Sequence, residues 1–66
     1  MNVIVNGEPV EMADGATTAA AVRTLTSAVN GIAVAVNGEV VRRGAWESTP
    51  LADGDQVEVL TAVQGG

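Results

Sequence analysis

Short runs of apolar residues alternate with polar ones along this chain, and Asn-Gly or Asp-Gly pairs separate the runs. The alternation over residues 1–6 predicts a strand, and Asn6-Gly7 predicts a tight turn into a second strand over residues 9–12. Asparagine and glycine both tolerate the positive φ angles of such turns. The apolar run at residues 32–36, followed by Asn37-Gly38, predicts another hairpin and a strand that is expected to be buried.

A helix is predicted between the two hairpins, over about residues 18–28. Thr17 stands at the N-cap position, where its hydroxyl is expected to accept a hydrogen bond from the first free backbone amides. Interior threonines and serines weaken the helix, so packing must hold it, and Asn30-Gly31 suits a left-handed C-terminal cap. One helical stripe is expected to pack on the sheet, formed by Ala21, Val22, Leu25, Ala28 and Val29.

The remaining segments complete an α+β order of elements. Residues 42–50 have mixed polarity and carry Trp46, the one aromatic residue. The Asp53-Gly54-Asp55 segment predicts a solvated turn into a last strand over residues 57–63. We therefore expect a mixed sheet of four to five strands with one main helix across one face. The tetrapeptide Val-Asn-Gly-Glu occurs twice, which we interpret as two hairpins with the same turn chemistry.

Length and composition narrow the classes of protein. Sixty-six residues make one domain, with residues 61–66 expected as an extended C-terminal tail. The absence of cysteine and histidine argues against disulfides and metal sites. A net charge of -5 disfavours nucleic acid. It fits either a basic protein partner or simple solubility. Residues 1–6 lack a basic region and a long apolar run, so we expect an unprocessed N-terminus, and no apolar stretch approaches bilayer length, so we expect no membrane. The absence of cysteine fits a cytoplasmic location.

Conventional catalytic groups are also missing. Without histidine or cysteine, no Ser/His/Asp or Cys/His arrangement is possible, and independent catalysis is not expected. Asp53 and Asp55 could act as an acid-base pair, but the glycine between them favours a turn. The candidate chemistry is therefore at the chain's end.

The chain ends in Gly65-Gly66, directly after the predicted last strand. Residues without β-carbons leave the Gly66 carboxylate open to ATP and to a nucleophile inside a narrow channel of a partner enzyme. Adenylation would turn this carboxylate into a mixed anhydride, which a persulfide or thiol could convert to a thiocarboxylate. A frayed terminus is the alternative, because at ordinary glycine usage roughly one chain in 200 ends in two glycines.

Several segments of the sequence resemble the thiamine-biosynthesis sulfur-carrier family, the bacterial ThiS proteins, and the likeness covers essentially the whole chain. Two features depart mildly from the family pattern: Arg42 stands where a proline is common, and the helix is rich in Ala and Thr. The resemblance implies a ubiquitin-like β-grasp fold. It is carried by Asn6 and its turn, Gly15 with Thr17, residues 33–37, Val41 with Arg43 and Trp46, residues 51–58, and Gly65-Gly66.

The resemblance implies a protein cosubstrate with no bound cofactor. An E1-like, ThiF-type enzyme would use ATP to adenylate Gly66, and a sulfur donor such as a cysteine desulfurase would complete the thiocarboxylate. Thiazole synthase of the ThiG type would receive the sulfur for the thiazole of thiamine. Leu60, Ala62, Val63 and Gln64 are expected to contact a partner. Alternatives are a carrier for molybdopterin or cysteine synthesis, or a non-covalent ubiquitin-like binding module.

For Arg43 and Trp46, structural roles are favoured over docking. The arginine is expected to pair with a nearby acid, and the indole is expected to cover one end of a small core.

Overall fold

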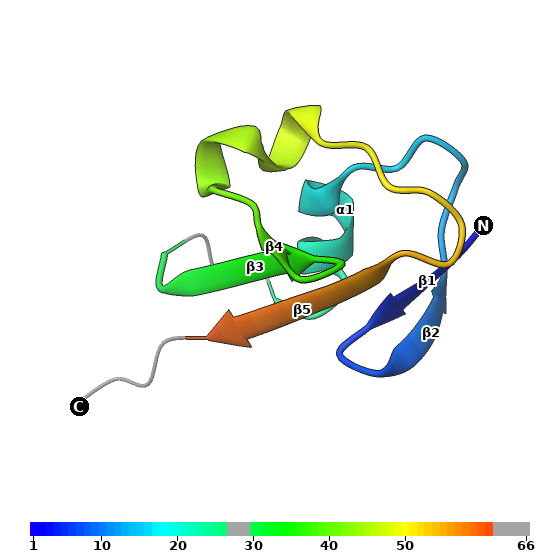
Figure 1. The fold of residues 1–66 in the computed structure, drawn as a ribbon, viewed down its shortest axis with the longest axis horizontal. Helices are drawn as coiled ribbons and strands as arrows, with labels where there is room; N and C mark the ends of the chain where they lie inside the picture. Colours follow the sequence, from blue (N-terminus) through cyan, green and yellow to red (C-terminus); the bar gives the residue numbers. More distant parts are fainter. Residues whose placement is uncertain (27–29, 62–66) are drawn as a thin grey trace.

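The computed structural model describes residues 1–26 and 30–61. All strands belong to one five-stranded sheet in the order β2-β1-β5-β3-β4, with helix α1 (Thr18–Arg23) across one face (Figure 1). This arrangement confirms the expected α+β fold with a mixed sheet. The strands are β1 (Asn2–Val5), β2 (Glu8–Glu11), β3 (Ile32–Val36), β4 (Glu39–Val40) and β5 (Gln56–Thr61).

Strand β5 lies in the centre of the sheet and contacts both hairpins. It runs parallel to β1, with Val5 opposite Val57. On its other side it pairs antiparallel with β3, from Ile32 opposite Thr61 to Val36 opposite Val57. The first and last strands of the chain are therefore neighbours, and Thr61, the first residue of the expected tail, belongs to β5.

Both Asn-Gly pairs form the predicted two-residue turns. The φ angles are 50° at Asn6 and 83° at Gly7, and 51° at Asn37 and 84° at Gly38. Positive φ at both central residues matches the right-handed twist of the strands that the turn joins. The interpretation of the repeated tetrapeptide as shared turn chemistry is confirmed.

Helix α1 begins where the sequence predicts, but its N-terminus is held differently. Thr17 occupies the N-cap position and makes no side-chain cap hydrogen bond, so the expected hydroxyl cap is wrong. Instead the backbone N–H of Thr18 donates to the Thr49 carbonyl at 2.9 Å, and its buried Oγ1 donates to the same oxygen at 3.0 Å. The loop before β5 therefore caps the helix.

The helix ends at Arg23, earlier than predicted. The next residue, Thr24, donates from its N–H at 3.2 Å and from its Oγ1 at 2.6 Å to the Ala21 carbonyl. These bonds to the residue three positions back tighten the last turn, and threonine hydroxyls that bond back to the helix weaken its continuation. Gly31 has the positive φ expected of a cap, 72°, but it does not directly follow the end of α1.

The predicted apolar stripe is only partly correct. Ala21 and Val22 are buried against the sheet, as expected, whereas Leu25 is 50% exposed, which contradicts its place in the stripe. Ala28 and Val29 lie outside the described residues.

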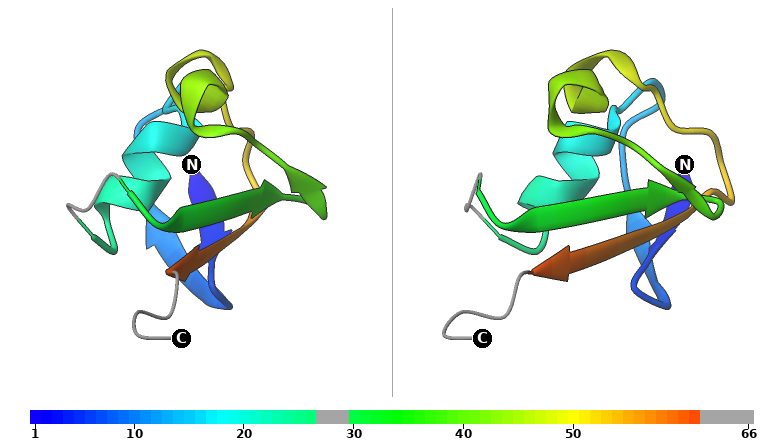
Figure 2. Two further views of the ribbon diagram at one scale, coloured as in Figure 1. Left: turned by 90° about the vertical axis from the view of Figure 1, so that its left-hand side faces the viewer. Right: turned by 60° about the vertical axis from the view of Figure 1, so that its left-hand side comes forward.

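The core between α1 and the sheet is built from small aliphatic side chains and one indole. Because α1 is short, the 3-10 helix η1 (Arg43–Ser48) covers the rest of the same face (Figure 2). An ion pair between Arg23 and Glu47 joins the two helices. The buried residues are Val3, Val5, Ala19, Ala21, Val22, Val34, Trp46, Leu51, Val57 and Val59.

Trp46 has the structural role expected of it. Its side chain is buried at the edge of the core, and its Nε1 donates to the Val41 carbonyl at 2.9 Å. Arg43, also in η1, donates from Nη1 to Oδ1 of Asn30 at 2.7 Å. Both side chains therefore attach η1 to the β3–β4 side of the fold.

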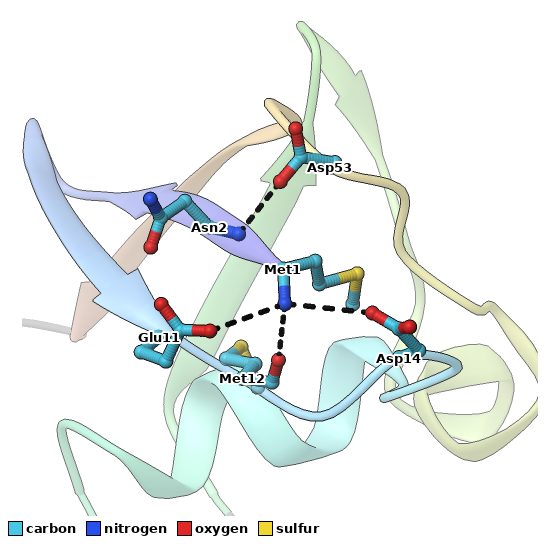
Figure 3. Close-up of polar contacts among 6 residues, drawn as sticks. All are labelled: Met1, Asn2, Glu11, Met12, Asp14 and Asp53. Atoms are coloured by element: carbon cyan, nitrogen blue, oxygen red, sulfur yellow. Dashed lines mark hydrogen bonds and ion pairs between the residues drawn. The ribbon is translucent and has the colours of Figure 1, made fainter.

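The N-terminus is bonded to the end of β2 and the residues just after it, and to the turn before β5 (Figure 3). The Met1 ammonium donates to the Met12 carbonyl at 2.7 Å and lies 3.3 Å from Glu11 Oε2. Partial burial lowers the pKa of this ammonium, but hydrogen bonds and charges of Glu11 and Asp14 outweigh that effect and raise the pKa above 8.0. The next backbone N–H, of Asn2, donates to Asp53 Oδ1 at 2.7 Å.

Candidate functional site

Strand β5 immediately precedes the C-terminal segment in the sequence. Of the predicted site residues, the structure places Leu60, near the end of β5 with its side chain 66% exposed. Ala62, Val63, Gln64, Gly65 and Gly66 lie outside the described residues. The geometry that can be examined is therefore the strand that precedes the diglycine, together with its surroundings.

Exposed apolar side chains gather around Leu60 on the face of the sheet opposite α1. Leu60 is opposite Ala33 in β3, and Ala35 is opposite both Glu58 and Val40. Val40 is 78% exposed. Within residues 1–26 and 30–61, both helices lie on the other side of the sheet (Figure 2). We call Ala33, Ala35, Val40 and Leu60 the outer patch.

The exposure of the outer patch contradicts one prediction. Strand β3 was expected to be buried, but of its five residues only Val34 is fully buried, and Ala33 is exposed. Two shallow depressions flank Leu60, one toward Val40 and the other toward Gly31 and Thr61. An apolar, shallowly hollowed surface next to the C-terminal segment is typical of a protein-binding face.

The position of β5 is fixed by two asparagine side chains from the two identical turns. Asn37 accepts a hydrogen bond from the Gln56 N–H at 3.0 Å, at the beginning of β5. Asn6 exchanges two hydrogen bonds with Val59, at 2.8 and 3.1 Å, near its end. Each asparagine therefore shapes its own turn and also holds the central strand.

The Asp53-Gly54-Asp55 segment is a turn, as predicted. Gly54 has a φ of 87°, and both carboxylates accept hydrogen bonds from backbone N–H groups. The Ala52 N–H and the Asn37 amide, which donate to Asp55, lower the pKa of that carboxyl below 3.8. The two acids stabilise the entry into β5.

Two further features bear on the kind of site. Within the described parts of the chain, no three Asp or Glu side chains come together in a group that could hold a metal ion. Neither described helix is long and apolar enough to cross a membrane.

The central parallel pair of first and last strands, the two flanking hairpins and the helix across one face define the ubiquitin-like β-grasp class. The family model described as "ThiS family" matches residues 3–66. The chain belongs to the ThiS family.

Relatives agree with this assignment over the full length of the chain. It is 29% identical to sulfur carrier protein ThiS of Escherichia coli K12 over 66 residues, which is 100% of both chains. The crystal structure of thiamine biosynthesis protein ThiS from Geobacter metallireducens matches with a TM-score of 0.81 and 35% identity, covering 100% of both chains. The solution structure of a thiamine biosynthesis protein from the same organism matches with a TM-score of 0.79 and 38% identity, covering 100% of this chain and 88% of that one.

The sequence analysis named Leu60 as a partner-contact residue, which stays a prediction, and it did not name the neighbours of Leu60 in the outer patch. Ala33 and Ala35 were assigned to a buried strand, and Val40 was given no role. Period-two spacing in β3, combined with the Glu58-to-Leu60 spacing in β5, could have placed these residues on one face. The bonds of Asn6 and Asn37 to β5 were missed as well, because they join segments far apart in sequence.

Proposed function

We propose that this chain is a sulfur carrier for thiazole formation in thiamine biosynthesis, with the Gly66 carboxylate as its reactive group. One observation carries the proposal: the match to the ThiS family extends to Gly66, so the diglycine that follows β5 belongs to the region shared with the family. On this proposal the chain is a protein cosubstrate, and other proteins perform the reaction upon it.

The chemistry needs three steps. A Gly66 carboxylate oxygen attacks the α-phosphorus of ATP in the active site of an E1-like enzyme, pyrophosphate leaves, and an acyl adenylate forms. A persulfide from a donor such as a cysteine desulfurase then displaces AMP and forms an acyl disulfide. A second thiol cleaves its S–S bond, leaving the thiocarboxylate on Gly66 and a disulfide on the donor side.

The outer patch is the surface that the activating enzyme binds. Leu60 lies in this patch, and Ala62, Val63 and Gln64 follow it along the chain as further contact residues. Five residues follow Thr61, and five extended residues reach at most roughly 17 Å. An enzyme docked on the patch can therefore have its nucleotide site no further than this from the end of β5.

The direct test is mass spectrometry of the intact protein after incubation with a ThiF-type enzyme, ATP and a sulfur source. The expected mass gain is that of one oxygen replaced by sulfur, located on Gly66. The matched control adds one alanine after Gly66, which leaves the domain intact and should abolish the gain. An unchanged mass, under conditions that modify the E. coli relative, would reject the proposal.

Two other functions give different results. A carrier for molybdopterin or cysteine synthesis would also gain sulfur but would not deliver it to thiazole synthase, so sulfur transfer to that enzyme separates the pathways. A non-covalent binding module would keep its function after deletion of Gly65 and Gly66. The ThiS family match favours the thiamine assignment.

A further inference from the structure

Strand β5 continues past the point where its neighbour β1 turns away. The last parallel pair joins Val5 to Val57, and the Asn6 N–H donates to the Val57 carbonyl at 2.9 Å. The chain then turns through Asn6 and Gly7, while β5 extends to Thr61. After this turn, β1 has no backbone residue left to continue the ladder along β5.

The side chain of Asn6 takes the place of the missing strand residue. Its Oδ1 accepts from the Val59 N–H at 2.8 Å, and its Nδ2 donates to the Val59 carbonyl at 3.1 Å. The amide thus offers Val59 one acceptor and one donor, as a paired strand would. Both bonds are partly buried, which strengthens them relative to bonds in water.

These bonds lie beside the surface that the proposed function uses. Leu60, the exposed centre of the outer patch, directly follows Val59. On the β3 side, the ladder continues through Leu60 opposite Ala33 and Thr61 opposite Ile32. Without the Asn6 bonds, the end of β5 would be held along one edge only.

We propose that Asn6 is a positioning residue that holds the end of β5, and with it Leu60 and Thr61, in the arrangement that the activating enzyme binds. This inference rests on the proposed function. The proposed role of Asn6 involves no contact with the reacting carboxylate. The residue keeps the binding-competent arrangement populated before the enzyme arrives.

This role predicts a specific kinetic signature. If the end of β5 is ordered only part of the time, the apparent affinity falls by the fraction that is ordered. Once the chain is bound, the enzyme holds the segment, so the rate of adenylation is unchanged. The KM for the carrier should therefore rise while kcat stays constant.

The chain contains its own matched control. Asn37 has the same position in the second Val-Asn-Gly-Glu turn, with φ of 51° against 50° at Asn6. It also makes two side-chain bonds, to Gln56 and Asp55, but at the beginning of β5. Glycine at either position preserves the positive φ and removes the amide.

The experiment compares Asn6→Gly, Asn6→Asp and Asn37→Gly in ATP–pyrophosphate exchange by a ThiF-type enzyme, with the stability of each variant measured by urea unfolding. We expect KM to rise about tenfold for Asn6→Gly with kcat within about twofold, and KM to change less than about twofold for Asn37→Gly. Asn6→Asp keeps the turn and one acceptor but sets a carboxylate oxygen against the Val59 carbonyl, so its KM should rise as well.

Amide hydrogen exchange gives a second readout that needs no enzyme. Exchange at Val59, whose N–H loses its acceptor, and at Leu60, which pairs with β3, should accelerate in Asn6→Gly while that at Ile4 is unchanged, and Asn37→Gly should leave Val59 and Leu60 protected. Equal KM changes in the two glycine variants, unaltered exchange at Leu60, or failure of both Asn6 variants to fold would each overturn the positioning role. If the wild-type chain gave no pyrophosphate exchange, the proposed function would fail, and hydrogen exchange would still decide the role of Asn6.

Discussion

Leu60→Ala should weaken binding to the activating enzyme without destabilising the free protein. Full burial of a leucine side chain contributes about 2 kcal/mol. Leu60 is 66% exposed, so about two thirds of that value, roughly 1.3 kcal/mol, remains to be gained on docking. At about 1.4 kcal/mol for each factor of ten, the variant should bind roughly tenfold more weakly. The free energy of unfolding should change by less than about 0.5 kcal/mol, as for most exposed positions.

The assay is again ATP–pyrophosphate exchange at varied carrier concentration, with KM as the measured quantity. Leu25→Ala is the control, because Leu25 is the other strongly exposed leucine and lies beyond α1, away from the outer patch. It should leave KM unchanged. Equal effects of the two substitutions would refute the assignment of docking to the outer patch, and so would a fall in kcat with KM constant.

Three further predictions concern stability and pH. Thr18→Val should cost about 1 kcal/mol in urea unfolding, because it removes a buried hydrogen bond, whereas the exposed control Thr24→Val should cost less than half of that. Asp55 has a lowered pKa, so its contribution to stability is present above pH 3.8 and is lost as the pH falls through the folded-state pKa. The decrease in the free energy of unfolding between about pH 6 and about pH 3 should be smaller in Asp55→Asn than in the wild-type protein. An equal decrease would contradict the assignment to Asp55. The Met1 ammonium has a raised pKa, so its contribution is present below pH 8.0 and is lost as the pH rises through the folded-state pKa. Acetylating this amine should remove the alkaline loss of stability, and acetylated protein that still showed it would disprove the assignment.

The turns and strands were predictable because their determinants are local. Positive φ at Asn6 and Asn37 follows from the residue types themselves, and a two-residue turn fixes the register of the strands that it joins. The bounds of the strand at residues 32–36 were predicted correctly for the same reason, although its burial was not. These signals need no information about the rest of the fold.

The bounds of the two helices were not predictable from the spacing of apolar residues. The end of α1 is set by Thr24, whose hydroxyl bonds back to Ala21, and spacing of apolar residues does not report such a bond. The helix η1 exists because Trp46 is buried and bonded to Val41, although its surrounding sequence has mixed polarity. In both cases a side-chain hydrogen bond, which the spacing of apolar residues does not report, decides where a helix forms or stops.

The candidate site, too, could be predicted from the sequence only in part. Leu60 was predicted as a contact residue because it immediately precedes the segment that carries the proposed chemistry, and the structure shows that it is exposed. Ala33 was misplaced because an apolar residue on an open sheet face looks, in sequence, like one in a buried strand. The predictions for Ala62, Val63, Gln64, Gly65 and Gly66 fall outside the described residues and stay predictions.

The structure offers a physical reason why a valine-built domain of this size can act as a carrier. A carrier whose end must enter a partner's active site benefits from an end without bulky side chains. If the whole end is flexible, however, ordering it on binding costs free energy and lowers the affinity. Here β5 is paired with β3 as far as Thr61, and it is also bonded to Asn37 at its beginning and to Asn6 at Val59, the residue before Leu60. If these bonds matter, the KM of variants should follow the protection of the Leu60 amide rather than the global free energy of unfolding. A set of core variants such as Val34→Ala, which lower global stability but leave both asparagine contacts in place, would separate the two quantities.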